Sequence, residues 1–218
     1  MNNKPIIGIV SRPITSNSNR NMLGVYETYQ KAVTFSGGIP LSILPTSMIN
    51  YDESNHNTKN TTEENQDLIQ ILKLCDGIIL PGGDEAYFYD YFIADYCYKN
   101  DIPVLGICLG MQVMCRYMSD TKLIKVNNHN MTNHNIYIDK NSVLFKILKK
   151  DKLLVNSRHL YQVNNAGIYD VVALSPDNVI EAVELKNKKF NIGVEWHPED
   201  LEDKKIFKYF INKCKVRK

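Results

Sequence analysis

Short β-branched runs alternate with helical segments through the first half of this sequence, and this alternation strongly limits the folds open to the chain. Ile6 to Val10, Gly77 to Leu80 and Pro103 to Ile107 are predicted strands. Tyr87 to Lys99 and Leu109 to Met118 are predicted helices. Strands separated by helices in this way indicate βαβ units around a parallel sheet.

The second half of the chain changes character. Its predicted strands are joined mainly by turns: Leu123 to Val126, Asn135 to Ile138, Leu153 to Val155, Tyr169 to Leu174, Val179 to Leu185 and Asn191 to Trp196. A last helix is predicted from Leu201 to Cys214. We therefore expect an α/β fold in which an open, mostly parallel, doubly wound sheet has helices on both faces and an added antiparallel β portion in the second half.

Length and composition limit the number of domains and the class of partner. The chain has 218 residues, is 44% hydrophobic and carries a formal net charge of +2 that forms no block. We expect a single domain over residues 1–218, since no linker or repeat divides the chain. The spread charge disfavours an electrostatic nucleic-acid binder, and no apolar run approaches the roughly 18–20 residues of a membrane helix. Without a secretory signal, a cytoplasmic protein is the simplest expectation.

The cysteines and histidines do not predict a metal centre. Five cysteines without CxxC spacing fit neither a disulfide framework nor a zinc site. His129 and His134 lie in an Asn-rich connection, and no carboxylate or thiol is spaced to complete a ligand set with them. We interpret both as solvated loop residues and expect neither a metal nor a cofactor.

The segment Val104 to Gln112 runs from a predicted strand through Gly-Ile-Cys-Leu-Gly into a predicted helix. The Gly-x-Ser-x-Gly turn has the same arrangement, with the nucleophile on a sharp, strained turn between strand and helix. Flanking glycines avoid clashes at such a turn, and the start of the helix favours a thiolate through its N–H groups and dipole. Cys108 is therefore a candidate nucleophile, although a small core residue at a strand end fits this motif equally well.

A glycine-rich loop supports the candidate nucleophile. Leu80 to Gly83 ends a neighbouring strand in a loop with little side chain, so its backbone N–H groups can approach a ligand. Ligands of open parallel sheets bind beyond the carboxyl ends of the strands, where Gly83 and Cys108 both belong. An oxyanion hole needs two convergent donors near the nucleophile, and the amides of Gly83 and Leu109 are the natural pair.

His197-Pro198-Glu199 follows another predicted strand. A cysteine nucleophile needs an imidazole to take its proton and later protonate the leaving amine, and a carboxylate to hold the imidazole in the correct tautomer. A histidine and a glutamate separated by one proline can place both side chains on one side of an extended segment. A lone His-Pro-Glu is typical of a loop, but together with Cys108 and Gly83 it completes a catalytic set.

With these motifs the chain resembles the class I glutamine amidotransferase superfamily, and within it the γ-glutamyl-γ-aminobutyrate hydrolase type, peptidase family C26. Six segments spread over nearly the whole chain carry the resemblance: Ile6 to Val10, Tyr29 to Pro40, Leu80 to Gly83, Gly106 to Gln112, Val155 to His159 and Gly193 to Glu199. The resemblance implies a flavodoxin-like sheet. It also implies a cysteine-dependent hydrolase that cleaves the γ-glutamyl amide bond of a small γ-glutamyl conjugate through a γ-glutamyl thioester.

The resemblance further implies a role for each matching residue. Cys108 is the nucleophile, His197 the general base and acid, and Glu199 the carboxylate that orients the histidine. Two residues supply the oxyanion hole, Gly83 and Leu109. Four residues lie near the glutamyl end of the substrate: Gln112, Ser157, Arg158 and His159.

Three departures from the family pattern concern the leaving group of the substrate. Leu109 replaces the arginine of the usual Gly-Ile-Cys-Arg-Gly. The segment Asp84 to Lys99 is short and tyrosine-rich and lacks the usual Arg-Asp pair, and the usual His-His-Gln becomes His-Leu-Tyr-Gln from His159 to Gln162. The acyl-transfer residues are retained, so these departures put in doubt only the pocket for the leaving group.

Three functions stay open. A hydrolase acting alone is favoured over a glutaminase subunit that delivers ammonia to a separate synthase. The third is a non-catalytic redox or binding relative, since a thiol at a helix N-terminus can be oxidised without hydrolysis; the retention of His197 and Glu199 argues against it. We expect a small-molecule γ-glutamyl substrate as partner, a synthase only under the glutaminase alternative, and neither nucleic acid nor membrane. A homodimer is left open.

Overall fold

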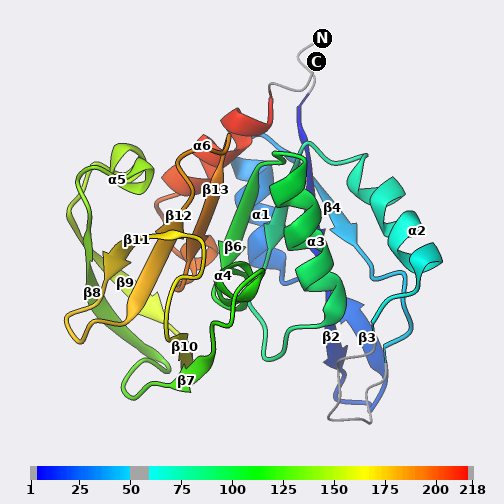
Figure 1. Ribbon diagram of the computed structural model, residues 1–218, viewed down its shortest axis with the longest axis horizontal. Coiled ribbons are helices and arrows are strands. Elements are labelled where there is room, and N and C mark those ends of the chain that lie inside the picture. Colours follow the sequence, from blue (N-terminus) through cyan, green and yellow to red (C-terminus); the bar gives the residue numbers. More distant parts are fainter. Residues whose placement is uncertain (1–3, 50–58, 216–218) are drawn as a thin grey trace.

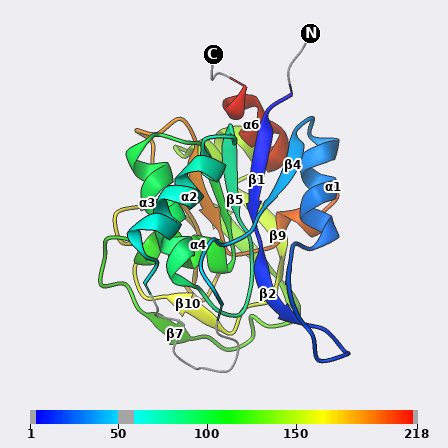
Figure 2. The same ribbon diagram turned by 90° about the vertical axis from the view of Figure 1, so that its right-hand side faces the viewer.

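The computed structural model describes residues 4–49 and 59–215, and in them a nine-stranded sheet lies between two layers of helices (Figures 1 and 2). The strand order is β4-β1-β5-β6-β13-β12-β11-β8-β9. In chain order these strands are β1 (Ile6–Val10), β4 (Ile39–Ile43), β5 (Gly77–Leu80), β6 (Val104–Ile107), β8 (Thr132–Ile138), β9 (Lys152–Ser157), β11 (Asp170–Leu174), β12 (Ile180–Glu184) and β13 (Asn191–Val194). Two small sheets pair β2 (Arg12–Thr15) with β3 (Asn21–Gly24), and β7 (Leu123–Lys125) with β10 (Tyr161–Val163).

The strands from β4 to β13 run parallel, and those from β12 to β9 pair antiparallel. The doubly wound sheet with an added antiparallel portion is therefore confirmed. Val194 of β13 pairs with Ile107 of β6, so these two strands end side by side. Cys108 and His197 consequently leave the sheet at the same edge, where ligands of open α/β sheets bind.

Helices cover both faces of the sheet, as Figure 2 shows: α1 and α6 lie on one side, and α2, α3 and α4 on the other. The helices are α1 (Glu27–Phe35), α2 (Thr62–Leu72), α3 (Phe88–Lys99), α4 (Leu109–Arg116), α5 (Val143–Leu148) and α6 (Lys205–Cys214), with a 3₁₀ turn η1 (Pro198–Asp200) before α6. Phe207 and Phe210 of α6 share one buried cluster with Tyr29 of α1, and Leu68 of α2 shares the other with Val113 of α4. Burying each phenylalanine contributes about 1.5–3 kcal/mol, which holds α6 to the sheet.

Helix α2 begins at a capping box formed by Thr61 and Glu64. The hydroxyl of Thr61 accepts from the Glu64 N–H at 3.2 Å, and the Thr61 N–H donates to the Glu64 carboxylate at 2.6 Å. Two N–H groups that have no partner inside the helix are satisfied in this way. The start of α2 is therefore determined by two residues only three positions apart.

Several elements differ from the sequence predictions. The hairpin of β2 and β3 forms in a segment for which no strand is predicted. Its first residue, Arg12, is buried through an ion pair with Asp90, a partner 78 positions away that no local pattern indicates. Strand β10 and the six-residue helix α5 are also not predicted, and α5 depends on Ser142, whose hydroxyl caps the Phe145 N–H at 2.9 Å. The last helix begins at Lys205, four residues later than expected, because the backbone at Leu201, just after η1, is extended.

Among the described residues, no helix combines the length and the apolar character that crossing a membrane requires.

Candidate active site

Cys108 occupies a strained turn between β6 and α4. Its backbone has φ 50° and ψ −110°, a combination that non-glycine residues rarely adopt and that concentrates at functional sites. The turn is held from both sides: the Cys108 N–H donates to the Val194 carbonyl at 2.8 Å, and its carbonyl accepts from the Gln112 N–H at 3.1 Å. Gly110 is required here, because a Cβ at that position would lie 1.9 Å from the Leu80 carbonyl oxygen.

The surroundings of Cys108 favour the neutral thiol. Burial raises its pKa well above the ordinary value, and the charges of Glu195 and Glu199 raise it further. The Leu109 N–H opposes this shift because it donates to the sulfur and so stabilises the thiolate. A neutral thiol is a weak nucleophile, so a base must take its proton before the sulfur can attack.

His197 and Glu199 form the pair that such a base requires. Nδ1 of His197 lies 2.7 Å from Oε1 of Glu199, which is buried at the start of η1. The carboxylate holds the proton on Nδ1 and leaves the lone pair of Nε2 free to accept another. The Tyr29 hydroxyl lies nearby, and burial together with the Glu199 charge raises its pKa well above the ordinary value.

The thiol, the imidazole and the loop after β5 meet at Gly82. A Cβ built on Gly82 would lie 2.8 Å from Cε1 of His197 and 3.6 Å from Cβ of Cys108. The Gly82 N–H donates to the Tyr29 hydroxyl at 2.9 Å, which ties this loop to α1. The structure thus brings together three segments that the sequence separates by up to 115 positions.

A cavity of about 680 Å³ opens over these groups. Its lining residues are Tyr26, Glu27, Thr28, Tyr29, Gly82, Gly83, Asp84, Cys108, Met131, Arg158, His197, Glu199 and Asp200. Volumes of this size hold small-molecule substrates. Arg158 and Asp200 add charge to the wall, with Nη1 of Arg158 2.5 Å from Oδ2 of Asp200.

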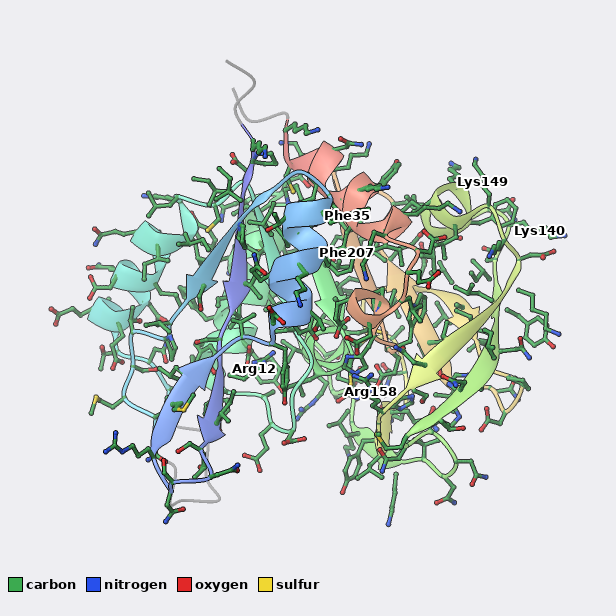
Figure 3. All side chains as sticks on the ribbon, turned by 180° about the vertical axis from the view of Figure 1, so that it is seen from behind. Arg12, Phe35, Lys140, Lys149, Arg158 and Phe207 are labelled. Carbon is green, nitrogen blue, oxygen red and sulfur yellow. The ribbon has the colours of Figure 1, made fainter. Side chains whose placement is uncertain are left out.

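Arg12 anchors the glycine loop, a contact that no sequence motif indicates. Its guanidinium donates to the carbonyl of Pro81 at 2.7 Å and to that of Gly82 at 3.3 Å. It also pairs with the buried carboxylate of Asp90 at 2.5 Å. Figure 3 labels Arg12 and Arg158 at the same end of the molecule, near one end of α1. The buried guanidinium of Arg12 therefore holds the backbone of the glycine loop in place.

Only one of the four residues expected near the glutamyl end of the substrate lines the cavity, namely Arg158. Gln112 is buried, and its Nε2 donates to Glu195 at 2.5 Å and to a backbone carbonyl. The Ser157 hydroxyl donates to the carbonyl of His129, and His159 is buried among other histidines. Protein groups therefore engage the polar atoms of these three residues, and their role near the substrate stays a prediction.

The interpretation of His129 and His134 as solvated loop residues is wrong. His129 is only 3% exposed, and the ring of His134 lies 4.4 Å from it, centroid to centroid. With His159 and the fully buried Glu181 they form a group whose ligand-type atoms all lie within 4.8 Å of one another. We call these four residues the histidine cluster. The missing carboxylate was undetectable from spacing because it comes from β12, 47 positions after His134.

The fold is that of class I glutamine amidotransferase domains. The glutaminase domain of Trypanosoma brucei CTPS, solved with bound acivicin, superposes with a TM-score of 0.71 at 19% identity. The match covers 96% of this chain and 93% of that one. Two proteins with similar sequences carry names that agree with this fold. A Rickettsia prowazekii protein named as glutamine amidotransferase-like is 28% identical over 94% of this chain and 95% of its own length. The CTP synthase of Chlamydia muridarum is 28% identical over 63% of this chain, which spans only 33% of that enzyme.

The family model of peptidase C26 matches residues 87–199, just over half of the chain. The chain therefore belongs to the peptidase C26 family. Peptidases hydrolyse amide bonds, so the family indicates amide-bond hydrolysis as the class of activity.

Proposed function

We propose that this chain hydrolyses the γ-glutamyl amide bond of a small γ-glutamyl conjugate, similar to γ-glutamyl-γ-aminobutyrate, and releases glutamate and an amine. One observation carries the proposal: Cys108 on its strained turn and the paired His197 and Glu199 border the same cavity. A nucleophile, a base and a group that orients the base are the components of covalent acyl transfer.

In the first half-reaction, His197 takes the thiol proton as the Cys108 sulfur bonds to the γ-carbonyl carbon. The carbonyl electron pair moves to oxygen, which the N–H groups of Gly83 and Leu109 stabilise. Two facts support this pair of donors: the Leu109 N–H already faces the sulfur, and the Gly83 N–H makes no hydrogen bond within the described part of the chain. The C–N bond then breaks, and His197 gives its proton to the departing amine.

In the second half-reaction, water attacks the γ-glutamyl thioester. His197 accepts a proton from the water and returns it to the sulfur as glutamate leaves. Glu199 stabilises the imidazolium that forms in each half-reaction and holds a proton on Nδ1, so that Nε2 can accept the thiol proton. Proton and electron pairs therefore balance over the cycle without an added cofactor.

The charged wall of the cavity fits the amino-acid end of a glutamyl group. Arg158 offers a guanidinium to the α-carboxylate, and Asp200 offers a carboxylate to the α-ammonium. The two side chains pair with each other at 2.5 Å. A bound glutamyl group would therefore exchange this one ion pair for two, one at its α-carboxylate and one at its α-ammonium. The amine side of the substrate lies toward the remaining lining residues.

A glutaminase function is the second candidate, in which the same residues release ammonia for a separate synthase. The relatives favour it, since they include a CTP synthase and a glutaminase domain. Under this proposal glutamine is the substrate, and the rest of the reaction belongs to a partner chain.

A hydrolysis screen with mass detection of the released amine tests both proposals. The panel contains γ-glutamyl-γ-aminobutyrate, short γ-glutamyl peptides and glutamine. We expect turnover of at least one conjugate other than glutamine, its loss in Cys108→Ala by more than about 1,000-fold, and retention in Cys115→Ala, a buried cysteine outside the cavity. Turnover of glutamine alone would instead favour the glutaminase. Equal activity of Cys108→Ala and the wild type would refute both.

A further inference from the structure

The histidine cluster lies outside the cavity, where the antiparallel strands meet the catalytic ones. Glu181 is on β12, His134 on β8, His129 before β8 and His159 after β9. Strand β11 separates β8 from β12 in the sheet. Its last residue, Leu174, pairs with Tyr137 of β8 and with Ile180 of β12, so His134 lies beyond the end of β11 and Glu181 lies alongside that end. The hairpin turn that follows carries Asp177, whose carboxylate lies 3.1 Å from Nε2 of His129.

The spacing of the facing atoms is that of ligands around one ion. Nδ1 of His129 lies 3.2 Å from Nε2 of His159 and 3.4 Å from Oε1 of Glu181. Nε2 of His134 and Nε2 of His159 lie 3.3 and 3.8 Å from the same Glu181 oxygen. Ligands bound at about 2.0–2.1 Å to a tetrahedral zinc ion are about 3.3 Å apart, which matches these separations.

In each of the three rings, the nitrogen that points away from Glu181 already faces a hydrogen-bond acceptor. Nε2 of His129 faces Asp177, Nδ1 of His159 lies 3.0 Å from the Tyr161 carbonyl oxygen, and Nδ1 of His134 lies 3.3 Å from the Asn135 carbonyl oxygen. If each outward nitrogen carries the proton, the three inward nitrogens present lone pairs to one another and to a carboxylate. Histidines that bind metals are held in this way, by a carboxylate or a backbone carbonyl at the other ring nitrogen.

The carboxylate at the centre of the cluster lacks a conventional partner. Glu181 is 0% exposed, and neither of its oxygens accepts a hydrogen bond within the described part of the chain. No lysine or arginine among the described residues forms an ion pair with Glu181 or with the equally buried Glu195 nearby. A buried carboxylate is costly unless a cation or hydrogen bonds compensate it, and a divalent ion would meet this requirement.

From these contacts we propose a four-coordinate zinc site whose ligands are three histidines and one glutamate: His129, His134, His159 and Glu181. Imidazole nitrogens with one carboxylate suit Zn²⁺ among the common divalent ions. Four protein ligands close the coordination sphere, so the site is structural and supplies no water for hydrolysis. This assignment replaces the expectation of a chain without metal and is independent of the proposed hydrolase function.

The site would connect the added antiparallel strands to the catalytic histidine. The backbone carbonyl of Glu181 accepts from the Glu195 N–H at 2.8 Å, two residues before His197. The carbonyl of His129 accepts from the Ser157 hydroxyl and from the His159 N–H. Asn156, next to Ser157, binds the backbone of His197. One ion would thus fix the segments that carry and hold the base.

Metal analysis of the untagged full-length chain tests the proposal. The protein is stripped with dipicolinate, incubated with one equivalent of Zn²⁺, desalted and analysed by mass spectrometry for metals. We expect about one zinc per chain and a rise in the unfolding temperature relative to the stripped protein. Cobalt in place of zinc should give the intense visible absorption of a four-coordinate site. This measurement needs only the wild-type chain.

Variants locate the ion. Glu181→Gln and His134→Ala should lose the stoichiometric zinc, and Asp177→Asn should weaken zinc binding about 10- to 100-fold. His197→Ala is the matched control, because His197, Glu199 and Asp200 form the other group of suitable spacing among the described residues. It should keep one zinc per chain.

The competing occupant of the cluster is a proton on His129, held between Glu181 and Asp177. Retention of less than about a tenth of an equivalent of zinc by the wild type would establish that reading and refute the metal site. Equal zinc content in the wild type and in both ligand variants would refute it as well.

Discussion

Asn156 and His197 are joined by two hydrogen bonds between one side chain and one backbone. The Asn156 carbonyl oxygen accepts from the His197 N–H at 2.8 Å, and its Nδ2 donates to the His197 carbonyl at 3.0 Å. The backbone N–H and the backbone carbonyl of His197 are therefore both held by a side chain of β9, 41 positions away. The imidazole is oriented through its own backbone as well as through Glu199.

Asn156→Ala should lower kcat about 10- to 100-fold with little change in KM, because the base loses its position while the substrate wall stays intact. Two lost hydrogen bonds should also reduce the free energy of unfolding by about 1–3 kcal/mol. Steady-state kinetics and urea titration measure the two effects. Asn133→Ala is the control, since Asn133 is the exposed cross-strand neighbour of Asn156. An unchanged kcat in Asn156→Ala would contradict this role.

Gly82→Ala should abolish most activity, since its Cβ would lie 2.8 Å from Cε1 of His197, where no atom fits without a shift. We expect a loss of at least about 100-fold in kcat/KM and a stability loss of about 1–3 kcal/mol from overpacking. Gly24→Ala tests the same change in the β2–β3 hairpin, where the nearest atom is a flexible Ile14 methyl at 3.1 Å. If both variants retained full activity, the contact between the loop and the imidazole would have no catalytic role.

Arg12→Met should destabilise the protein by about 3–5 kcal/mol, because it leaves the carboxylate of Asp90 buried without its cation. Activity in the remaining folded protein should fall too, since the Pro81 and Gly82 carbonyls lose their donor. Thermal and urea unfolding measure the stability. Lys31→Ala removes an exposed ion pair with Glu27 and should change stability by no more than about 0.5 kcal/mol. Similar losses in the two variants would argue against a buried, structural role for Arg12.

Alkylation of Cys108 by iodoacetamide should accelerate steadily from pH 7 to pH 10. The pKa of the thiol is raised by burial and by the charges of Glu195 and Glu199, so the thiolate fraction keeps growing over this range. The same shift makes stability depend on pH. Because the folded state holds the thiol proton more tightly than the unfolded chain, the free energy of unfolding falls as pH rises from the unfolded-state pKa of the thiol toward its folded-state pKa. Peptide mass spectrometry resolves Cys108 from the other cysteines. A plateau below pH 8 would instead show a preformed thiolate.

The local patterns of the sequence determined the βαβ order, the capping box of α2 and the strand-to-helix turn at Cys108. Each depends on residues within a few positions of one another, where spacing and backbone preference decide the outcome. The pairing of His197 with Glu199 belongs to the same class, because one intervening proline brings the two side chains together. For this reason the residues of the proposed triad can be named from the sequence alone.

Tertiary structure alone decided how those residues are held. Asn156, Arg12 and Tyr29 reach the site from distant positions, and only the arrangement of the strands brings them there. The same cause explains the histidine cluster. His129 and His134 look solvated in a polar segment, and Glu181 looks like an ordinary strand residue. They become a candidate metal centre only because the fold brings β8, β12 and the segments before β8 and after β9 together. Contacts across a sheet leave no spacing in the chain from which they could be predicted.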